Sequence, residues 1–319
     1  TYAQAMAGPN IGGATPAGYT PLVFTPTANG EYYIELYVSA DAGATATASQ
    51  QTLLTLFDFT VATAANVKYP GRVYSQAWSI MTYDPATNVG QINNSLEGDF
   101  FAYTTDSTIN KVNFLNGFRP FGFTLYMNKY GAVNGGNWVN DRRSQNTGAT
   151  APSLPGGYPV FLNSPDAAVF ARSAVAPAPT FGGKIYGCYP NYFIPFRTTM
   201  PGDIAILLDL NGVAGYQSGT ADRFLFSYDA AAGNNVFPWD GLDGLGAIVS
   251  TSVTFNMRIS LRRGRTNIPM FDAELNGNGM SVSGIEPMAY SPLMYWNDAL
   301  LANTATATCD ATAGTQNNN

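Results

Sequence analysis

The sequence predicts an all-β protein made of two tandem antiparallel β-sandwiches, the first of jelly-roll or lectin-like type and the second immunoglobulin-like. Aromatic residues make up 13% of the chain and charged residues only 11%, which is typical of short strands joined by polar turns. Strand-length apolar segments recur between Gly, Asn, Asp and Pro residues, which favour turns. None of the strand-length segments in the first half keeps a helical period over eleven residues.

The first half of the chain predicts an arm followed by a sandwich. Residues 1–18 are small and interrupted by Gly and Pro, so we expect an extended arm. The segments YTPLVFTP and EYYIELYV flank Asn29-Gly30, a pair that favours a hairpin. Further strand-length segments complete a first sandwich over residues 19–131: QTLLTLFDFTVA, GRVYSQAWSIMTY, GDFFAYTTDS, INKVNFL and FRPFGFTLYMNKYG.

The second half predicts a connection and then a second sandwich. Residues 132–185 are rich in Gly, Pro, Ser and Asn and form a long connection or insertion, in which residues 164–172 predict a short helix because Pro follows an N-cap-like Ser. Residues 186–301 predict the immunoglobulin-like sandwich, from segments such as YFIPFRT, GDIAILLDL and DRFLFSYD. Residues 302–319 are expected to form a linker-like tail. We therefore expect the chain to be a piece of a longer protein.

Charge and hydropathy exclude two classes of partner. The net charge of -6 argues against nucleic acid, because phosphate binding needs a field of Lys and Arg. No apolar run is long enough to cross a membrane, so no membrane insertion is expected. The basic cluster Arg262-Arg263-Gly264-Arg265 is interpreted as a solvated loop, with an interface or an anionic-glycan contact as the alternative.

The side chains available for catalysis are few. The chain has no histidine, which removes the commonest general base and metal ligand. We therefore expect a protein that is not an enzyme. The two cysteines, Cys188 and Cys309, are either bridged or two free thiols, and a bridge fits a secreted or cell-surface protein.

Two groups of residues are candidates for ligand binding. Asp209, Asn211 and Asp222 place oxygens as a calcium loop does, but the same residues suit an Asx-type turn, and no other cofactor is predicted. Trp138 and Tyr158 are aromatic residues in a loop-rich region and are candidate glycan contacts.

The stretch VFPWDGLDGLGAIV carries two Asp-Gly turn signals next to a tryptophan. Together with GDIAILLDLNGVAGYQSGTADR, NIPMFDAELNGNGMSV and LMYWNDALL, in that order, it resembles a module of very large surface adhesins of gliding Bacteroidota, exported by type IX secretion. The first half is similar to the segment that precedes this module, through TPLVFTPTANGEYYIEL, LTLFDFTVA, GRVYSQAWSI and FRPFGFTLYMNKYG. The resemblance covers residues 19–301. It implies a structural hairpin in which the tryptophan packs on the core while the Asp-Gly pairs turn the chain, made by Trp239, Asp240, Gly241, Asp243, Gly244 and Gly246.

The resemblance implies an extracellular, cell-surface location. The expected function is therefore a noncatalytic structural or adhesive segment of a large attachment protein. Its expected partners are other copies of itself, because open strand edges allow strand addition, and glycans or prey or host surfaces. The alternatives are a carbohydrate-binding module and a virus-like jelly-roll capsid or fibre protein.

Overall fold

The computed structural model describes residues 1–36, 57–82, 95–120, 122–144, 154–270 and 276–292, with residues 294 and 297. Within them the protein is nearly all β, and its sheets are antiparallel, which confirms the predicted fold class. The chain divides into two units, Thr1–Val73 and Tyr74–Asn319. No helix among the described residues is both long and apolar enough to cross a membrane.

The first unit differs from the predicted arm and hairpin. The arm contains a helix, α1 (Tyr2–Ala7), because Thr1 and Gln4 form a capping box at its N-terminus. Residues 20–36 form no strand, although the Phe24 and Tyr32 rings meet across the Asn29-Gly30 turn with centroids 5.5 Å apart. Propensity alone does not make a strand, because a strand needs a partner and a covered face. Residues 51–56 of the next predicted strand lie outside the described residues.

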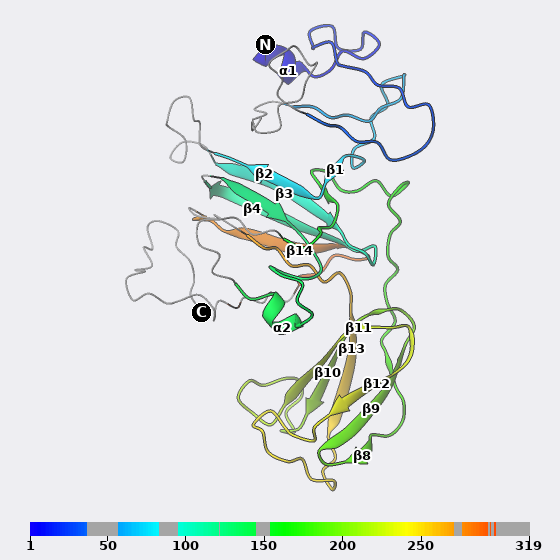
Figure 1. Cartoon of the computed structure of the whole chain (residues 1–319), viewed down its shortest axis with the longest axis vertical. Helices are drawn as coiled ribbons and strands as arrows, with labels where there is room; N and C mark the ends of the chain where they lie inside the picture. The colour runs from blue at the N-terminus through cyan, green and yellow to red at the C-terminus, as the bar shows by residue number, and fades with distance from the viewer. Residues whose placement is uncertain are drawn as a thin grey trace. The chain divides into compact units, whose positions relative to one another are not determined.

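Five strands of the second unit form one antiparallel sheet in the order β1-β6-β3-β4-β14. They are β1 (Tyr74–Ser75), β3 (Leu96–Tyr103), β4 (Ile109–Phe118), β6 (Val160–Phe161) and β14 (Met280–Glu286). Figure 1 shows β3, β4 and β14 side by side. Strands β2 (Ala77–Ile80) and β5 (Phe123–Tyr126) pair with each other, and their side chains pack against the same core as those of the sheet.

Aromatic side chains fill that core. Phe114 is fully buried on β4, and its ring contacts those of Phe100, Phe118 and Phe123 at centroid distances of 5.7, 4.8 and 5.6 Å. These residues lie on strands because aromatic side chains pack well on a pleated, half-buried surface. The apolar face of β4 therefore meets the pair β2-β5 and is removed from water.

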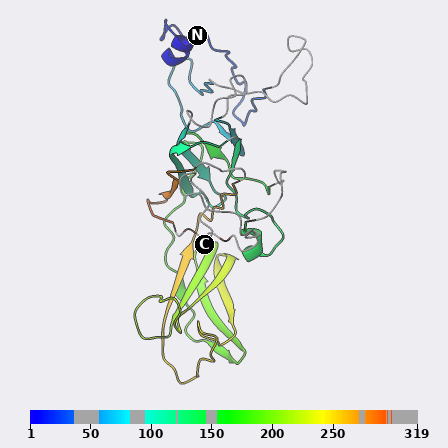
Figure 2. The same cartoon turned by 90° about the vertical axis from the view of Figure 1, so that its left-hand side faces the viewer.

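Two further sheets enclose the second core. One has the order β11-β10-β13, with β10 (Gly202–Asp209), β11 (Arg223–Ala230) and β13 (Asn256–Arg262). The other is built on β9 (Asn191–Thr198), which pairs with β7 (Thr180–Phe181), β8 (Tyr186–Cys188) and β12 (Gly233–Trp239). Figure 2 shows these strands, coloured green to orange-yellow, running alongside one another. Their inward residues form one core cluster: Ile194, Phe196, Ile204, Ile206, Leu208, Leu225, Ala230 and Trp239.

The domain boundaries differ from those predicted. Strands β6 and β7 lie inside the segment 132–185, and β6 pairs with β1 and β3, so part of the predicted connection belongs to the first sheet. Strand β14, assigned to the second sandwich, pairs with β4 instead. The chain therefore leaves the first sheet, builds the second core and returns. Local sequence does not reveal this return, since a strand's pattern says nothing of its partner.

The helix predicted at residues 164–172 is a turn, in which Asp166 accepts hydrogen bonds from the backbone N–H groups of Ala168, Val169 and Phe170. Asp166 thus stabilises a single turn with its side chain and backbone carbonyl, and the chain does not continue into a helix. The short helix α2 (Trp138–Asp141) lies in the same predicted connection, with Asn137 as its N-cap.

Candidate functional site

Trp239 ends β12 and packs into the second core. Its side chain is only 6% exposed, and its ring lies 5.4 Å from that of Tyr192 and 6.2 Å from that of Phe255. The indole Nε1–H donates a hydrogen bond to the Leu242 carbonyl, 2.9 Å away. A buried indole needs such a partner, so the tryptophan holds the turn that follows it against the core.

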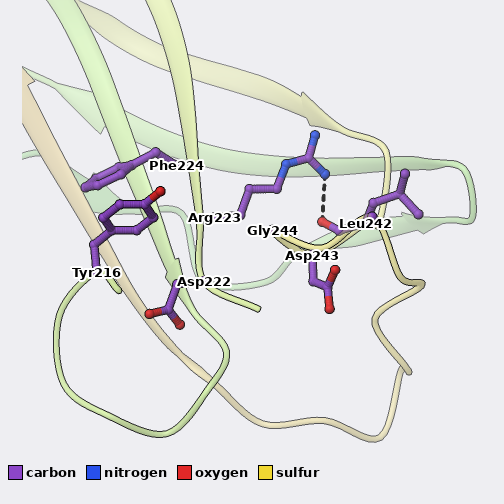
Figure 3. Close-up of a pocket in the computed structure, with 8 residues that line it drawn as sticks. Tyr216, Asp222, Arg223, Phe224, Leu242, Asp243 and Gly244 are labelled. Atoms are coloured by element: carbon purple, nitrogen blue, oxygen red, sulfur yellow. Dashed lines mark hydrogen bonds between the residues drawn. The ribbon is translucent and has the colours of Figure 1, made fainter. Parts of the chain in front are cut away.

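The first Asp-Gly pair turns the chain and binds an arginine. Asp240 Oδ1 accepts a hydrogen bond from the Leu242 N–H at 3.0 Å, and Gly241 has a φ of 77°, which favours glycine. Arg223 of β11 binds both oxygens of Asp240, at 2.6 and 3.0 Å. It also donates a hydrogen bond to the Leu242 carbonyl at 2.7 Å, the dashed line in Figure 3. The hydrogen bond from Arg223 is the main cause that lowers the pKa of Asp240.

The second Asp-Gly pair makes a close backbone contact. Asp243 Oδ1 accepts hydrogen bonds from the N–H groups of Leu245 and Ala247, at 2.9 and 2.8 Å. A Cβ at Gly244 would lie 2.1 Å from the carbonyl oxygen of Asp222, so only glycine fits there. Gly246 has a φ of 81°. The stretch is thus a chain reversal stabilised by its own side chains.

Asp209, Asn211 and Asp222 come together next to this turn. Asp222 is buried, and its two oxygens accept hydrogen bonds from the backbone N–H groups of Leu210, Asn211 and Gln217, at 2.9 to 3.1 Å, and from the Asn211 side-chain amide at 3.0 Å. Burial raises the pKa of Asp222, but these donors outweigh it and hold the pKa below its usual value.

A calcium ion needs oxygen lone pairs that face it, whereas the oxygens of Asp222 face amide hydrogens. Asn211 Oδ1 likewise accepts from the Val213 N–H at 2.7 Å. Asn211 thus makes the Asx-type turn of the two interpretations, while Asp209 Oδ2 accepts a hydrogen bond from the Gly215 N–H at 3.2 Å. No cluster of metal-ligating acids or cysteines occurs among the described residues.

An open depression of about 400 Å³ lies between the Asp222 loop and the WDGLDG turn. Figure 3 shows the Tyr216 and Phe224 rings side by side at its edge. Its two acids, Asp222 and Asp243, already accept backbone hydrogen bonds. The depression therefore presents aromatic surface to solvent rather than an acid poised for proton transfer. It is lined by Tyr216, Asp222, Arg223, Phe224, Leu242, Asp243, Gly244 and Gly246.

Of the two candidate glycan contacts, Tyr158 does not lie on the surface. Tyr158 is buried, only 5% exposed, and its hydroxyl donates to the Arg265 carbonyl at 2.8 Å, so its prediction as a glycan contact is wrong. The apolar loop residue is buried because it packs into the core of the five-stranded sheet. Trp138 begins α2, and its side chain lies outside the described part of the chain.

Cys188 is exposed on the short strand β8 and has no disulfide partner among the described residues. Cys309 lies outside the described residues. The disulfide between them stays a prediction.

A group of acids and arginines, here called the Asp–Arg junction, joins the second core to the five-stranded sheet. It consists of Asp106, Asp203, Asp229, Arg263 and Arg265. Asp106 lies in the loop between β3 and β4 and accepts a hydrogen bond from the Gly264 N–H at 2.8 Å, while its backbone carbonyl accepts from Arg263 at 2.7 Å. Arg265 bridges Asp203 of β10 and Asp229 of β11, each at 3.1 Å.

This junction corrects the interpretation of Arg262-Arg263-Gly264-Arg265 as a solvated loop. The Arg263 and Arg265 side chains are only 11% and 15% exposed. Arginine is suited to this position because its planar group binds several oxygens at once. The sequence showed the cluster of arginines, but not the acids that meet it from residues 106, 203 and 229.

The pKa values of two acids in the junction, Asp106 and Asp203, are shifted in opposite directions. Burial raises the pKa of Asp106, but hydrogen bonds from Thr104, Gly264 and Thr108 and the charge of Arg263 outweigh it, so the pKa is lowered. Burial also raises the pKa of Asp203, and there the donors reduce the rise without cancelling it. Both carboxylates serve as acceptors for neighbouring loops and strands.

The outward face of β11 also carries a row of aromatic rings that was not predicted from the sequence. The rings of Phe224, Phe226 and Tyr228 follow one another at 5.7 and 6.4 Å, and Tyr216 adds a fourth, 4.8 Å from Phe224. The alternation of DRFLFSYD contained this row, because residues two apart share a face. Arg262 lies over the Phe226 ring at 5.6 Å.

Comparison of the chain with family models, curated proteins and solved structures finds no match.

Proposed function

We propose that the chain is a noncatalytic structural and adhesive segment of a large cell-surface attachment protein, displayed outside the cell and assembling with further copies of itself. The resemblance to type IX-secreted adhesins of gliding bacteria belongs to this proposal. One observation carries the noncatalytic part. The partly buried acids Asp106 and Asp203 and the buried Asp222 accept hydrogen bonds from loops and strands that they hold together.

A catalytic acid must instead reach a substrate proton with a suitable pKa. In the described residues the lowered pKa values of Asp106 and Asp222 follow from backbone and side-chain donors, and both groups would have to break structural bonds before acting. Such acids stabilise the fold, as expected of a segment that transmits load between other parts of a surface protein.

Apolar side chains in the first unit support self-assembly. Leu22 is 102% exposed and Tyr33 is 86% exposed, although both lie in strand-like sequence. Exposed apolar groups of this kind mark contact surfaces. In identical copies they would be covered by a partner's surface.

Adhesion can be tested with the chain coupled to beads. We expect the beads to be held on a glass or polysaccharide surface under flow, and the free chain to sediment as an oligomer at micromolar concentration. Beads carrying the heat-unfolded chain are the control. Equal detachment of both bead types together with a monomeric free chain would contradict the proposal, as would turnover of a substrate.

The aromatic row on β11 favours a second candidate, carbohydrate binding. Sugar rings pack their C–H groups on aromatic faces, and Tyr216 is 48% exposed next to Phe224. A glycan array would show signals that are lost in the Tyr216→Ala variant. Tyr186→Ala is the matched control, because Tyr186 is 49% exposed on the other sheet. A blank array, or equal loss in both variants, would remove this candidate.

A further inference from the structure

The exposed segment that follows Asn29-Gly30 has the sequence pattern of a strand but forms no strand in the described part of the chain. Residues 31–36, here called the 31–36 arm, read EYYIEL and belong to no strand in the structure. Tyr32, Ile34 and Leu36 alternate with Glu31, Tyr33 and Glu35, so an extended arm would have one apolar face and one acidic face. Its four apolar residues are all exposed: Tyr32 45%, Tyr33 86%, Ile34 61% and Leu36 54%.

The sandwich offers an edge that matches this pattern. In the described residues β13 pairs with β10 alone and ends the sheet β11-β10-β13. Its residues Met257, Ile259 and Leu261 are only partly buried where they pack against the second core. Arg258 and Arg262 alternate with them on the outward face, where Arg258 is exposed and the Arg262 guanidinium lies over the Phe226 ring of β11 at 5.6 Å. The edge thus has an incompletely covered apolar side and a basic side.

The charges of the arm and the edge have the same spacing. Glu31 and Glu35 are four residues apart, as are Arg258 and Arg262, so both pairs span about 13 Å in an extended strand. An antiparallel pairing that sets Tyr33 opposite Ser260 sets Glu35 opposite Arg258 and Glu31 opposite Arg262. The same register brings apolar residues together on the other face: Tyr32 with Leu261, Ile34 with Ile259, and Leu36 with Met257.

Arginines on an edge strand ordinarily discourage pairing with a second identical edge. They admit a strand whose acids meet them, because opposite charges across a pair of strands attract and like charges repel. Strand addition then supplies backbone hydrogen bonds as well as apolar contact.

We propose that the 31–36 arm of one copy adds as a strand to the free edge of β13 in a second copy. This inference rests on the self-assembly in the proposed function and names the two surfaces that meet. Each copy has one arm and one edge, so the contact is head-to-tail, and repetition produces a ring or a filament.

Charge reversal in the full-length chain tests the pairing. One variant combines Glu31→Arg with Glu35→Arg, and the other combines Arg258→Glu with Arg262→Glu. Each variant alone places like charges opposite each other, and we expect its self-association to weaken at least about tenfold in sedimentation. An equimolar mixture restores both contacts, because each chain then meets a partner of opposite charge, and assembly returns. Circular dichroism checks that both variants remain folded.

Cysteine cross-linking tests the register in chains whose two native cysteines are replaced by Ser. A Tyr33→Cys chain mixed with a Ser260→Cys chain is expected to form a disulfide between the two chains under mild oxidation. The matched control pairs Tyr33→Cys with Val236→Cys, which is 49% exposed on β12 of the other sheet, and should form none.

The outcomes separate this inference from the proposed function. If the wild type assembles and each charge-reversed variant assembles equally well alone, another surface is used and the inference is overturned while self-assembly stands. A monomeric wild type overturns both. A chain with both Tyr33→Cys and Ser260→Cys that cross-links only within itself would show the arm on its own sandwich, which overturns the contact between copies.

Discussion

Strand-like sequence occurs in both units of the chain, but its apolar side chains are buried in the second unit and exposed in the first. In the second unit Phe114 and Phe118 are 0% exposed between the five-stranded sheet and the pair β2-β5. In the first unit Leu22 and Tyr33 lie in equally apolar, alternating sequence but are exposed. The difference shows that alternation supplies a face to bury, whereas a second layer decides whether it is buried. Substitutions in the two units test this contrast.

The largest effect is expected for Phe114→Ala in the five-stranded sheet. The variant removes a fully buried ring that contacts three others, and we expect the free energy of unfolding to fall by about 3–5 kcal/mol. Urea denaturation followed by tryptophan fluorescence measures it. A loss below about 1 kcal/mol would show that the core tolerates a cavity and that the two units differ less than the structure indicates.

Asp106→Asn is expected to lower the free energy of unfolding by about 2–4 kcal/mol near neutral pH, because Arg263 and the Gly264 N–H lose their charged partner. The folded pKa of Asp106 lies below its unfolded value of about 3.9. Its contribution is therefore present above that pH and is lost as the pH falls through the folded pKa. Urea denaturation of the wild type between neutral and acidic pH should show this loss, and the variant should show less of it.

Asp203→Asn is the matched control for that pH dependence. The folded pKa of Asp203 is raised, so its contribution falls as the pH rises from the unfolded value through the folded one, the opposite sign. In the Asp203→Asn variant, the free energy of unfolding should no longer show this fall with rising pH. Equal pH profiles for both variants would show that the two acids share one environment.

Gly244→Ala tests the close contact in the WDGLDG turn. The new Cβ would meet backbone oxygens of Asp222 and Thr220 at 2.1 and 2.6 Å, so the backbone must move, and we expect a loss of about 1–3 kcal/mol. Gly246→Ala is the control, because it has open space around the Cβ and only the cost of its positive φ, about 1 kcal/mol. Chemical denaturation of both variants decides whether contact or conformation governs the turn.

The smallest effect is expected for Leu22→Ala in the first unit. Leu22 is 102% exposed, so the free energy of unfolding should change by less than about 0.5 kcal/mol when it is measured in dilute solution. A loss comparable to that of Phe114→Ala would mean that Leu22 is covered in solution, and the contrast between the units would fail.

Much of the local structure was accessible from sequence. The segments around β3, β4, β9, β10 and β11 were predicted as strands because alternating aromatic and branched residues suit a pleated surface. The reversal at residues 240–246 was predicted because Asp and Gly stabilise turns within a few residues. Both rest on interactions between near neighbours, which the order of residues contains.

The sequence by itself thus determined the β class, the aromatic faces and the turn at Trp239. Only the tertiary structure decided that β14 returns to β4, that Tyr158 is buried, and that Arg263 and Arg265 meet acids from residues 106, 203 and 229. These pairings join residues that are distant along the chain. A local pattern states what a side chain requires, and only the packing of layers determines which distant residue provides it.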